Sequence, residues 1–286
     1  MHTPIHPNTT MGAVALTVAD LDRSLAYYQQ QIGLALLQHS AEGALLGTGE
    51  RVLLRLTAQP GARPVQQRRT GLYHFALLVP SRLELARTLN HLLTSQTPIS
   101  GASDHHVSEA LYLSDPDGHG IEIYRDRPRV EWEYPNGWLR MGTDPFDGEG
   151  VLGELTGNEP TWTGIHPATV MGHTHLHVAQ IAASEQFYGG VLGFDRMASY
   201  GGQASFMAAG GYHHHLGLNT WAGVGAPPPP ADAARLLWYE IHLPDAAALA
   251  ATLTRVREAN IPVSEQAEGW LLHDPAQNAI LLTQRA

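Results

Sequence analysis

Two stretches of this chain repeat the same pattern about 160 residues apart. The segment VADLDRSLAYYQQQIGLALL at 18–37 resembles VAQIAASEQFYGGVLGFDRM at 178–197, and the two share a valine, a tyrosine and a glycine at an offset of 160. A second pair, SDPDGHGIEIY (114–124) and HDPAQNAILLT (273–283), recurs at an offset of 159. Self-similarity at such a long period indicates that the chain contains two modules of similar plan.

Each module divides again into two smaller units. A strand pattern, a turn and an amphipathic helix pattern occur four times, and short apolar segments broken by Gly, Pro and Asp follow each of them. We therefore predict four βαβββ units, numbered one to four, which begin near residues 11, 71, 171 and 236. The predicted fold class is α+β.

The segment 125–170 has a different composition from the units around it. It is rich in Pro, Gly, Trp and acidic residues and shows little periodicity, so we interpret it as the connection between the modules. The predicted division is an N-terminal module at 1–124, the connection, and a C-terminal module at 171–286. The run GAPPPPAD (225–232) predicts a stiff spacer between units three and four.

Composition limits the classes of function. The 286 residues are 43% hydrophobic and only 15% charged, which predicts a folded core. The formal net charge of −10 argues against a nucleic-acid partner. The absence of cysteine excludes disulfides, thiolate nucleophiles and thiolate metal ligands, and it fits a reducing compartment.

The sequence has the pattern neither of a secretory signal nor of a membrane span. The first residues, MHTPIHPNTTMGAVALTV, lack the basic region and the long apolar run of a secretory signal. No stretch approaches the ~20 apolar residues of a membrane span. We therefore expect a cytoplasmic protein without a membrane partner.

The repeated units resemble a known superfamily. The strand–helix openings that end in Gly-Leu or Gly-Phe, together with the closing strand DPDGHGIEIY, are similar to the vicinal oxygen chelate superfamily, which includes glyoxalases, bleomycin resistance proteins and extradiol dioxygenases. The two-module length and GGYHHHLGLNTW (210–221) resemble its catechol 2,3-dioxygenase branch. The resemblance implies two tandem modules whose four units form cup-shaped mixed β-sheets flanked by helices.

The resemblance also implies where a metal would bind. In this superfamily the ligands come from the first and last strands of a unit, and the valine or leucine that ends the first strand serves as a ruler. The ligand position then falls on Ala13, His74, His173 and Trp238 in units one to four, and the last-strand carboxylate position falls on Glu122 in unit two and Leu281 in unit four. His74, Glu122 and His173 are the expected metal ligands.

This ligand set works only if units two and three share one cup. The dioxygenase pattern normally places the metal in units three and four, so the chain departs from it. Swapped pairing of units is known in the superfamily, and we adopt it as a hypothesis. Units one and four would then form a cup without ligands.

The histidine run at 213–215 supplies the expected acid–base group. Aligned on Leu216, the dioxygenase pattern places its acid–base histidine at His214, with His213 beside it. We expect the run to lie on a strand, where alternation puts His213 and His215 on the face opposite to His214, although a bulge would reverse the faces. His215 is retained as a substrate-binding candidate.

Four further residues are candidates for the site. Tyr112, ten residues before Glu122, has the spacing of an active-site tyrosine. His105 and His106 fall near the substrate-side histidine, and the sequence leaves the choice between them open; His106 is assigned a catalytic and His105 a substrate-binding role. His175, two residues after His173 on the same face, is a substrate-binding candidate.

The implied activity is extradiol ring cleavage. Two histidines and one carboxylate leave positions open on a divalent metal, with Fe(II) expected first and Mn(II) as the alternative. The implied partners are a small aromatic diol and O2, and the implied reaction opens the ring beside the diol while a histidine moves protons. Edge strands of such modules often pair between chains, which leaves a homo-oligomer open.

Two other classes compete with this interpretation. A glyoxalase-type isomerase or a thiol transferase uses the same fold, but the isomerase typically needs a second carboxylate ligand and the transferase chain is half as long. The third reading is a non-catalytic protein that binds a flat aromatic ligand. Metal content separates that reading from both enzymes.

Overall fold

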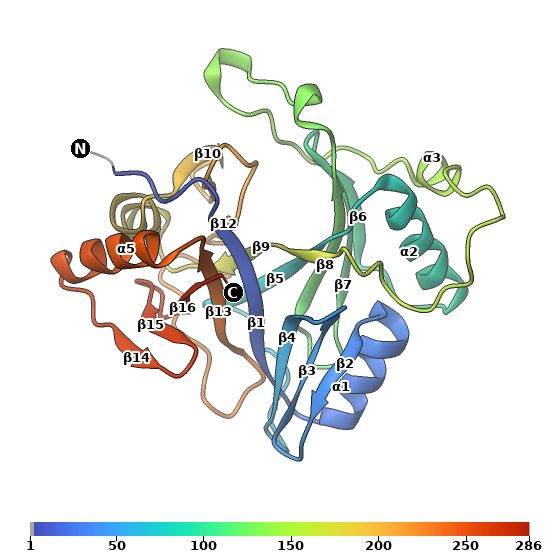
Figure 1. Ribbon diagram of the computed structural model, residues 1–286, viewed down its shortest axis with the longest axis horizontal. Coiled ribbons are helices and arrows are strands. Elements are labelled where there is room, and N and C mark those ends of the chain that lie inside the picture. Colours follow the sequence, from blue (N-terminus) through green and yellow to red (C-terminus); the bar gives the residue numbers. More distant parts are fainter. Residues whose placement is uncertain (1–2, 286) are drawn as a thin grey trace.

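The computed structural model describes residues 3–285 and contains two eight-stranded mixed sheets with flanking helices (Figure 1). The predicted fold class is confirmed. The predicted unit starts are also confirmed, because the first strand of each unit is β1 (Thr10–Val18), β5 (Gly71–Leu78), β9 (Val170–His177) and β13 (Leu236–Leu243). The division of the chain at 125 and 170 into modules and a connection stays a prediction.

The first sheet combines unit one with unit four. Strands β1 and β13 pair antiparallel at its centre, so the first and last quarters of the chain form one surface. In sheet order the strands are β14 (Ser264–Gln266), β15 (Gly269–His273), β16 (Ala279–Gln284), β13, β1, β4 (Arg51–Ala58), β3 (Gly43–Thr48) and β2 (Ala35–His39).

The second sheet combines unit two with unit three, as the hypothesis of a shared cup requires. Strands β5 and β9 pair antiparallel at its centre, and each also pairs in parallel with the last strand of its own unit. In sheet order the strands are β10 (Asp195–Tyr200), β11 (Ala204–Ala208), β12 (Leu216–Asn219), β9, β5, β8 (Gly120–Asp126), β7 (Ser108–Ser114) and β6 (Gly101–Asp104).

Helices follow the first strand of every unit. The helices are α1 (Leu21–Tyr27) with η1 (Tyr28–Ile32), α2 (Arg82–Thr94), α4 (Ile181–Glu185) with η4 (Gln186–Leu192), and α5 (Ala246–Glu258). Side chains of Asp20, Ser81 and Asp245 cap three of them by accepting a bond from a backbone N–H of the first turn. Figure 1 shows α1 and α2 on one flank of the molecule and α5 on the other.

The repeated sequence motifs connect the helical segments of units one and three to a turn in the unit that follows each of them. The buried hydroxyl of Tyr28 donates to Asp115 at 2.9 Å, and the repeat equivalent Tyr188 donates to Asp274 at 3.0 Å. Asp115 also accepts bonds from the backbone N–H groups of Asp117 and His119. These contacts hold the DPDG turn in place, because a buried carboxylate needs several donors.

The segment after β8 crosses from one unit to the next and contains only short helices, η2 (Arg129–Glu131), η3 (Pro135–Gly137) and α3 (Gly148–Leu152). Trp132 and Leu139 from this segment pack with Val107 in a small separate apolar cluster. The segment therefore covers part of the second sheet. None of the helices within residues 3–285 has the length and apolarity that spanning a bilayer would require.

Candidate active site

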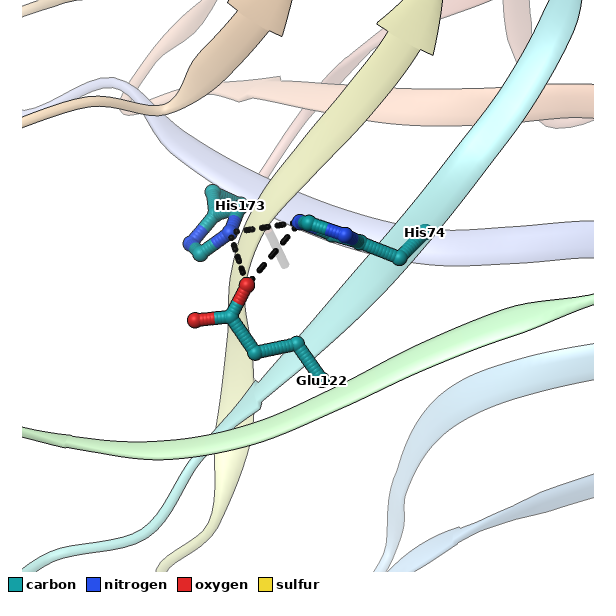
Figure 2. Close-up of side chains that lie close together, drawn as sticks. All are labelled: His74, Glu122 and His173. Carbon is teal, nitrogen blue, oxygen red and sulfur yellow. Dashed lines mark hydrogen bonds and ion pairs between the residues drawn. The ribbon is translucent and has the colours of Figure 1, made fainter. Parts of the chain in front are cut away.

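Three neighbouring strands of the second sheet bring the predicted ligands together. His74 lies on β5, Glu122 on β8 and His173 on β9 (Figure 2). The strand register explains the convergence: Ala76 of β5 pairs with Glu122 on one side and with His173 on the other, and His74 lies two residues away on the same face. The small Ala76 side chain leaves space between the longer side chains.

One atom of each of the three side chains lies close to one atom of each of the other two. The distance from His74 Nε2 to Glu122 Oε2 is 2.9 Å, that from His173 Nε2 to Glu122 Oε2 is 3.2 Å, and the two Nε2 atoms are 3.3 Å apart. The relative exposure is 5% for His74, 3% for Glu122 and 1% for His173. Within the described residues, these three form the group of His, Asp and Glu side chains that could hold a metal ion.

The spacing fits one divalent cation. Donors ~2.1 Å from a shared centre are about 3.0 Å apart when their bonds are at right angles and about 3.4 Å apart in a tetrahedron. The measured distances, from 2.9 to 3.3 Å, lie in or close to this range. His173 Nδ1 is buried without a hydrogen-bond partner, so Nε2 is the ring nitrogen that the protein directs at the other two ligands.

The electrostatics of the group match the needs of a metal site. Burial opposes ionisation of Glu122, but the facing His173 and His74 outweigh burial and hold the pKa of this carboxyl well below its ordinary value. Burial lowers the pKa of His173 to about 4, so the imidazole is neutral at neutral pH. A carboxylate and neutral imidazoles are the forms that bind metals.

A cavity of about 1410 Å³ opens beside this group. His74 and Glu122 line it, and His173 is held behind them. Trp138 and Met141 of the segment after β8 form part of its wall, so that segment contributes to the site and does more than connect the units. The cavity exceeds the usual 300–1,000 Å³ of small-molecule sites, which leaves room for an elongated ligand.

The histidine run is not on a strand, contrary to our expectation. Residues 213–215 precede β12, because Gly210 and Gly211 both adopt positive φ and turn the chain just before them. His214 lines the cavity, and its ring centroid is 4.1 Å from that of His173. His213 and His215 are not among the described residues that line the cavity.

A chain of hydrogen bonds fixes the proton positions behind His214. Asp126 can only accept, so His213 donates from Nε2 to Asp126 Oδ1 over 2.8 Å. His213 Nδ1 is then the acceptor from His214 Nδ1 at 2.7 Å. His214 Nε2 is left unprotonated, and it has no bonded partner within residues 3–285. Burial lowers the pKa of His214 well below its ordinary value, which keeps this nitrogen available as a base.

The side chains of the neighbours His105 and His106 point in different directions. His105 lines the cavity; its Nδ1 donates to the carbonyl of Gly142 and its Nε2 accepts from the hydroxyl of Tyr112, both at 2.6 Å. His106 has a φ of 68° and turns toward Asp144, 3.3 Å away, and it is not among the described lining residues. Both assigned roles stay predictions, although the geometry favours His105.

Tyr112 completes the wall next to the triad. It pairs directly with Glu122 across β7 and β8, so the even spacing of ten residues does place both on one face. Burial and the Glu122 carboxylate raise the pKa of Tyr112 well above its ordinary value, and its hydroxyl stays protonated. Tyr112 can therefore donate a hydrogen bond to His105 while it faces the cavity.

His175 and two aromatic residues form the opposite wall. The ring of His175 is 4.9 Å from that of His74, and its buried Nε2 has no hydrogen-bond partner. His215 is turned away, because its Nδ1 accepts from the backbone N–H of Ala209. The sequence interpretation missed Tyr73 and Trp221, whose rings are 5.2 Å apart and both line the cavity.

Tyr73 reaches this wall because of a bulge. The β5–β9 register shifts between Leu72 and His74, so Tyr73 is not directed to the face that strict alternation gives it. Its ring instead contacts His74, His175 and His177. An aromatic residue directly before a ligand histidine was the available signal, but a bulge is not visible in a single sequence.

The first sheet has other side chains at the positions that correspond to the metal-ligand group. Trp238 lies in the ligand position of unit four, and Glu240 occupies the position of Ala76, where it accepts a bond from the backbone N–H of Ala13 at 2.8 Å. His242 also contacts Glu240 at 2.8 Å. The first sheet therefore repeats the plan of the second without the three converging ligands, within the described residues.

Comparison with known proteins agrees with this geometry. Residues 10–123 match the model of the Glyoxalase/Bleomycin resistance protein/Dioxygenase superfamily. A Bacillus subtilis (strain 168) protein named Catechol-2,3-dioxygenase is 44% identical over 283 residues, which is 98% of each chain.

Solved structures share the fold at low identity. Glyoxalase I from Zea mays has a TM-score of 0.58 at 16% identity, over 97% of this chain and 92% of that one. The cppA protein from Streptococcus pneumoniae TIGR4 has a TM-score of 0.54 at 12% identity, over 98% and 99%. With a relative 44% identical along almost its whole length, the chain belongs to the glyoxalase/bleomycin resistance/dioxygenase superfamily.

Proposed function

We propose that this protein is a metal-dependent extradiol dioxygenase that opens a catechol-type ring with O2. The observation that carries the proposal is the buried group of His74, Glu122 and His173 at the wall of a large cavity, with His214 beside it. The relative named Catechol-2,3-dioxygenase, 44% identical over the whole chain, supports the same activity.

The proposed ligands hold one divalent metal through two neutral imidazoles and one carboxylate. When bound, such a metal supplies open positions for the two diol oxygens and for O2. We propose Fe(II) first, with Mn(II) as the alternative, because both accept this ligand set. An aromatic diol and O2 are the proposed small-molecule partners, and a cytoplasmic location fits the chain without cysteine.

The chain's own groups would handle the protons. In the resting state His214 Nε2 is unprotonated and faces the cavity, so it can accept a proton from a diol hydroxyl as the substrate binds. The same nitrogen can return the proton to an oxygen of the substrate later in the reaction. His213 and Asp126 hold the tautomer that makes this exchange available.

The other wall residues would orient the ring. Tyr112, kept protonated, and His105 form a fixed donor–acceptor pair on one side of the triad. His175 and Tyr73 cover the other side with aromatic faces. Together they exclude water from the reacting oxygens and hold the ring next to the triad.

The test is metal content combined with oxygen uptake. Protein purified without oxygen should carry about one iron or manganese per chain, consume O2 when catechol is added and release a yellow ring-opened acid. Nickel or zinc without oxygen uptake would favour an isomerase or transferase instead. A protein that binds catechol but no metal would be a binding protein and would overturn the proposal.

A further inference from the structure

The cavity wall has a charge opposite to that of the chain. Acidic residues outnumber basic ones by 27 to 17 in the sequence. The described residues that line the cavity include one acidic residue, Glu122, and four arginines: Arg68, Arg69, Arg196 and Arg235. Glu122 faces His74 and His173, so its charge is directed to the candidate metal and not to the remaining space.

Most of these arginines have no carboxylate partner. Arg68 and Arg69 have neither a hydrogen bond nor an ion pair with any residue in 3–285. Arg235 donates to Gln59 and to the carbonyl of Ala231, which are uncharged. A guanidinium that lines a cavity with no anionic partner is a ready donor pair for a carboxylate ligand.

Arg196 is the one of these four arginines with a carboxylate partner, Glu185, and it also contacts the ring of Trp138. Its Nη1 is 3.4 Å from Glu185, in a half-exposed pair, and its guanidinium is 5.1 Å from the centre of the Trp138 ring. A partner at this distance and exposure cancels little of its charge. The contact also places the arginine against the segment after β8, which lines part of the cavity.

The pair Arg68–Arg69 has a defined place relative to the triad. Both precede β5, the strand that carries His74, and the loop is fixed by the backbone N–H of Thr70, which donates to Pro227 at 3.0 Å. Arg69 lies five positions before His74, and a chain of that length spans at most about 16 Å when extended. Arg68 and Arg69 therefore lie on the cavity wall just before the strand that carries one of the candidate ligands.

We propose that the substrate is an aromatic diol that carries a carboxylate on a side chain, with the diol at the triad and the carboxylate at Arg68 and Arg69. The inference rests on the proposed ring-cleaving function and specifies its substrate class. The size of the cavity supports it, because about 150 Å³ suffices for a benzene ring and this cavity measures about 1410 Å³. An unsubstituted catechol would leave most of that space and every arginine unused.

The test compares two diols that differ in one charge. The probes are 3-(3,4-dihydroxyphenyl)propionate and its methyl ester, with catechol as the small reference. In the wild type we expect kcat/KM from oxygen uptake to favour the propionate about tenfold over the ester, since hydrogen bonds to charged groups are the stronger ones. In R68Q/R69Q this ratio should fall to about one, with kcat/KM for catechol unchanged.

A charge-matched control isolates the local effect. R257Q/R285Q removes two exposed arginines, one in α5 and one directly after β16, and it should keep the tenfold preference. The dissociation constants of both probes, measured by calorimetry on protein loaded with redox-inert Zn(II), should follow the same pattern without turnover.

The outcomes separate the two proposals. If the wild type cleaves and binds the propionate and the ester equally, or if R68Q/R69Q keeps the preference, the acidic-substrate inference is wrong while ring cleavage stands. If no probe consumes oxygen on metal-loaded protein, ring cleavage is wrong. Calorimetry then still decides the inference, since selective binding of the propionate that depends on Arg68 and Arg69 would support it.

Discussion

His213 Nδ1 and His214 Nδ1 lie 2.7 Å apart, and only one of the two nitrogens can carry the proton between them. The other side of His213 faces the acceptor Asp126, which assigns that proton to His214. A fully buried histidine with no contact to the cavity thereby decides which nitrogen of its neighbour faces the substrate.

We predict that D126N lowers kcat about tenfold with little change in KM. The amide can donate as well as accept, so His213 and His214 are no longer held in one tautomer. The measurement is steady-state kinetics of oxygen uptake together with metal content, which should stay at the wild-type level. E133Q, which changes an exposed acid of the segment after β8, is the control. An equal loss of activity in both variants would contradict the role of Asp126.

H214Q should lose most of its turnover but keep its metal. General acid–base groups contribute about 10²–10⁴-fold to rate, and His214 is not one of the three converging ligands. We expect metal content near one per chain and a fall in kcat within that range. H39Q, at an exposed position on β2, should behave as wild type. Loss of the metal in H214Q would instead indicate that His214 is a metal ligand.

H173A should abolish metal binding. His173 supplies one of three donor atoms, and the two that remain, with their partner gone, leave too few ligands to hold a divalent cation tightly. Metal analysis should show a fall from about one metal per chain to a small fraction. H242A is the matched control, because His242 occupies a strand of the first sheet and contacts Glu240 there. Thermal unfolding shows whether both variants fold.

The neighbours His105 and His106 allow a direct comparison. In H105N the shorter side chain cannot reach the hydroxyl of Tyr112, so we expect kcat/KM to fall about tenfold, the effect of one lost hydrogen bond of ~1.4 kcal/mol. H106N should remain within about twofold, and Asn tolerates the positive φ at that position. A larger loss in H106N than in H105N would restore the catalytic role that the sequence interpretation gave to His106.

The free energy of unfolding of the metal-free protein should fall as the pH drops below 6.5. Burial lowers the pKa of His215 to about 3 from an ordinary value of 6.5. Between these values the unfolded chain binds a proton that the folded protein does not, so acid favours unfolding. H215N should reduce the slope of stability against pH by about 1.4 kcal/mol per pH unit. Urea titrations from pH 4.5 to 7 measure the slope; H39Q, with an exposed histidine, should leave it unchanged.

Local patterns in the sequence were sufficient to determine the repeated units. The starts of β1, β5, β9 and β13 could be predicted because each is an apolar strand followed by a turn and a helix pattern, and these signals extend over a few residues. The ruler that the family resemblance supplied placed His74, Glu122 and His173 on the first and last strands of their units. A side chain's place along a strand depends on the strand's own period of two.

Tertiary structure alone decided what these positions face. The pairing of β5 with β9 joins residues about 100 apart in the chain, and no local pattern specifies a contact between strands of different units. The bulge at Tyr73, the turn that directs His214 but not His213 into the cavity, and the unpartnered Arg68 and Arg69 on its wall all depend on neighbouring strands and loops. The sequence by itself determined which residues lie on which strand, whereas the packing of the sheets determined which side chains share one space, because that packing is set by contacts between distant segments.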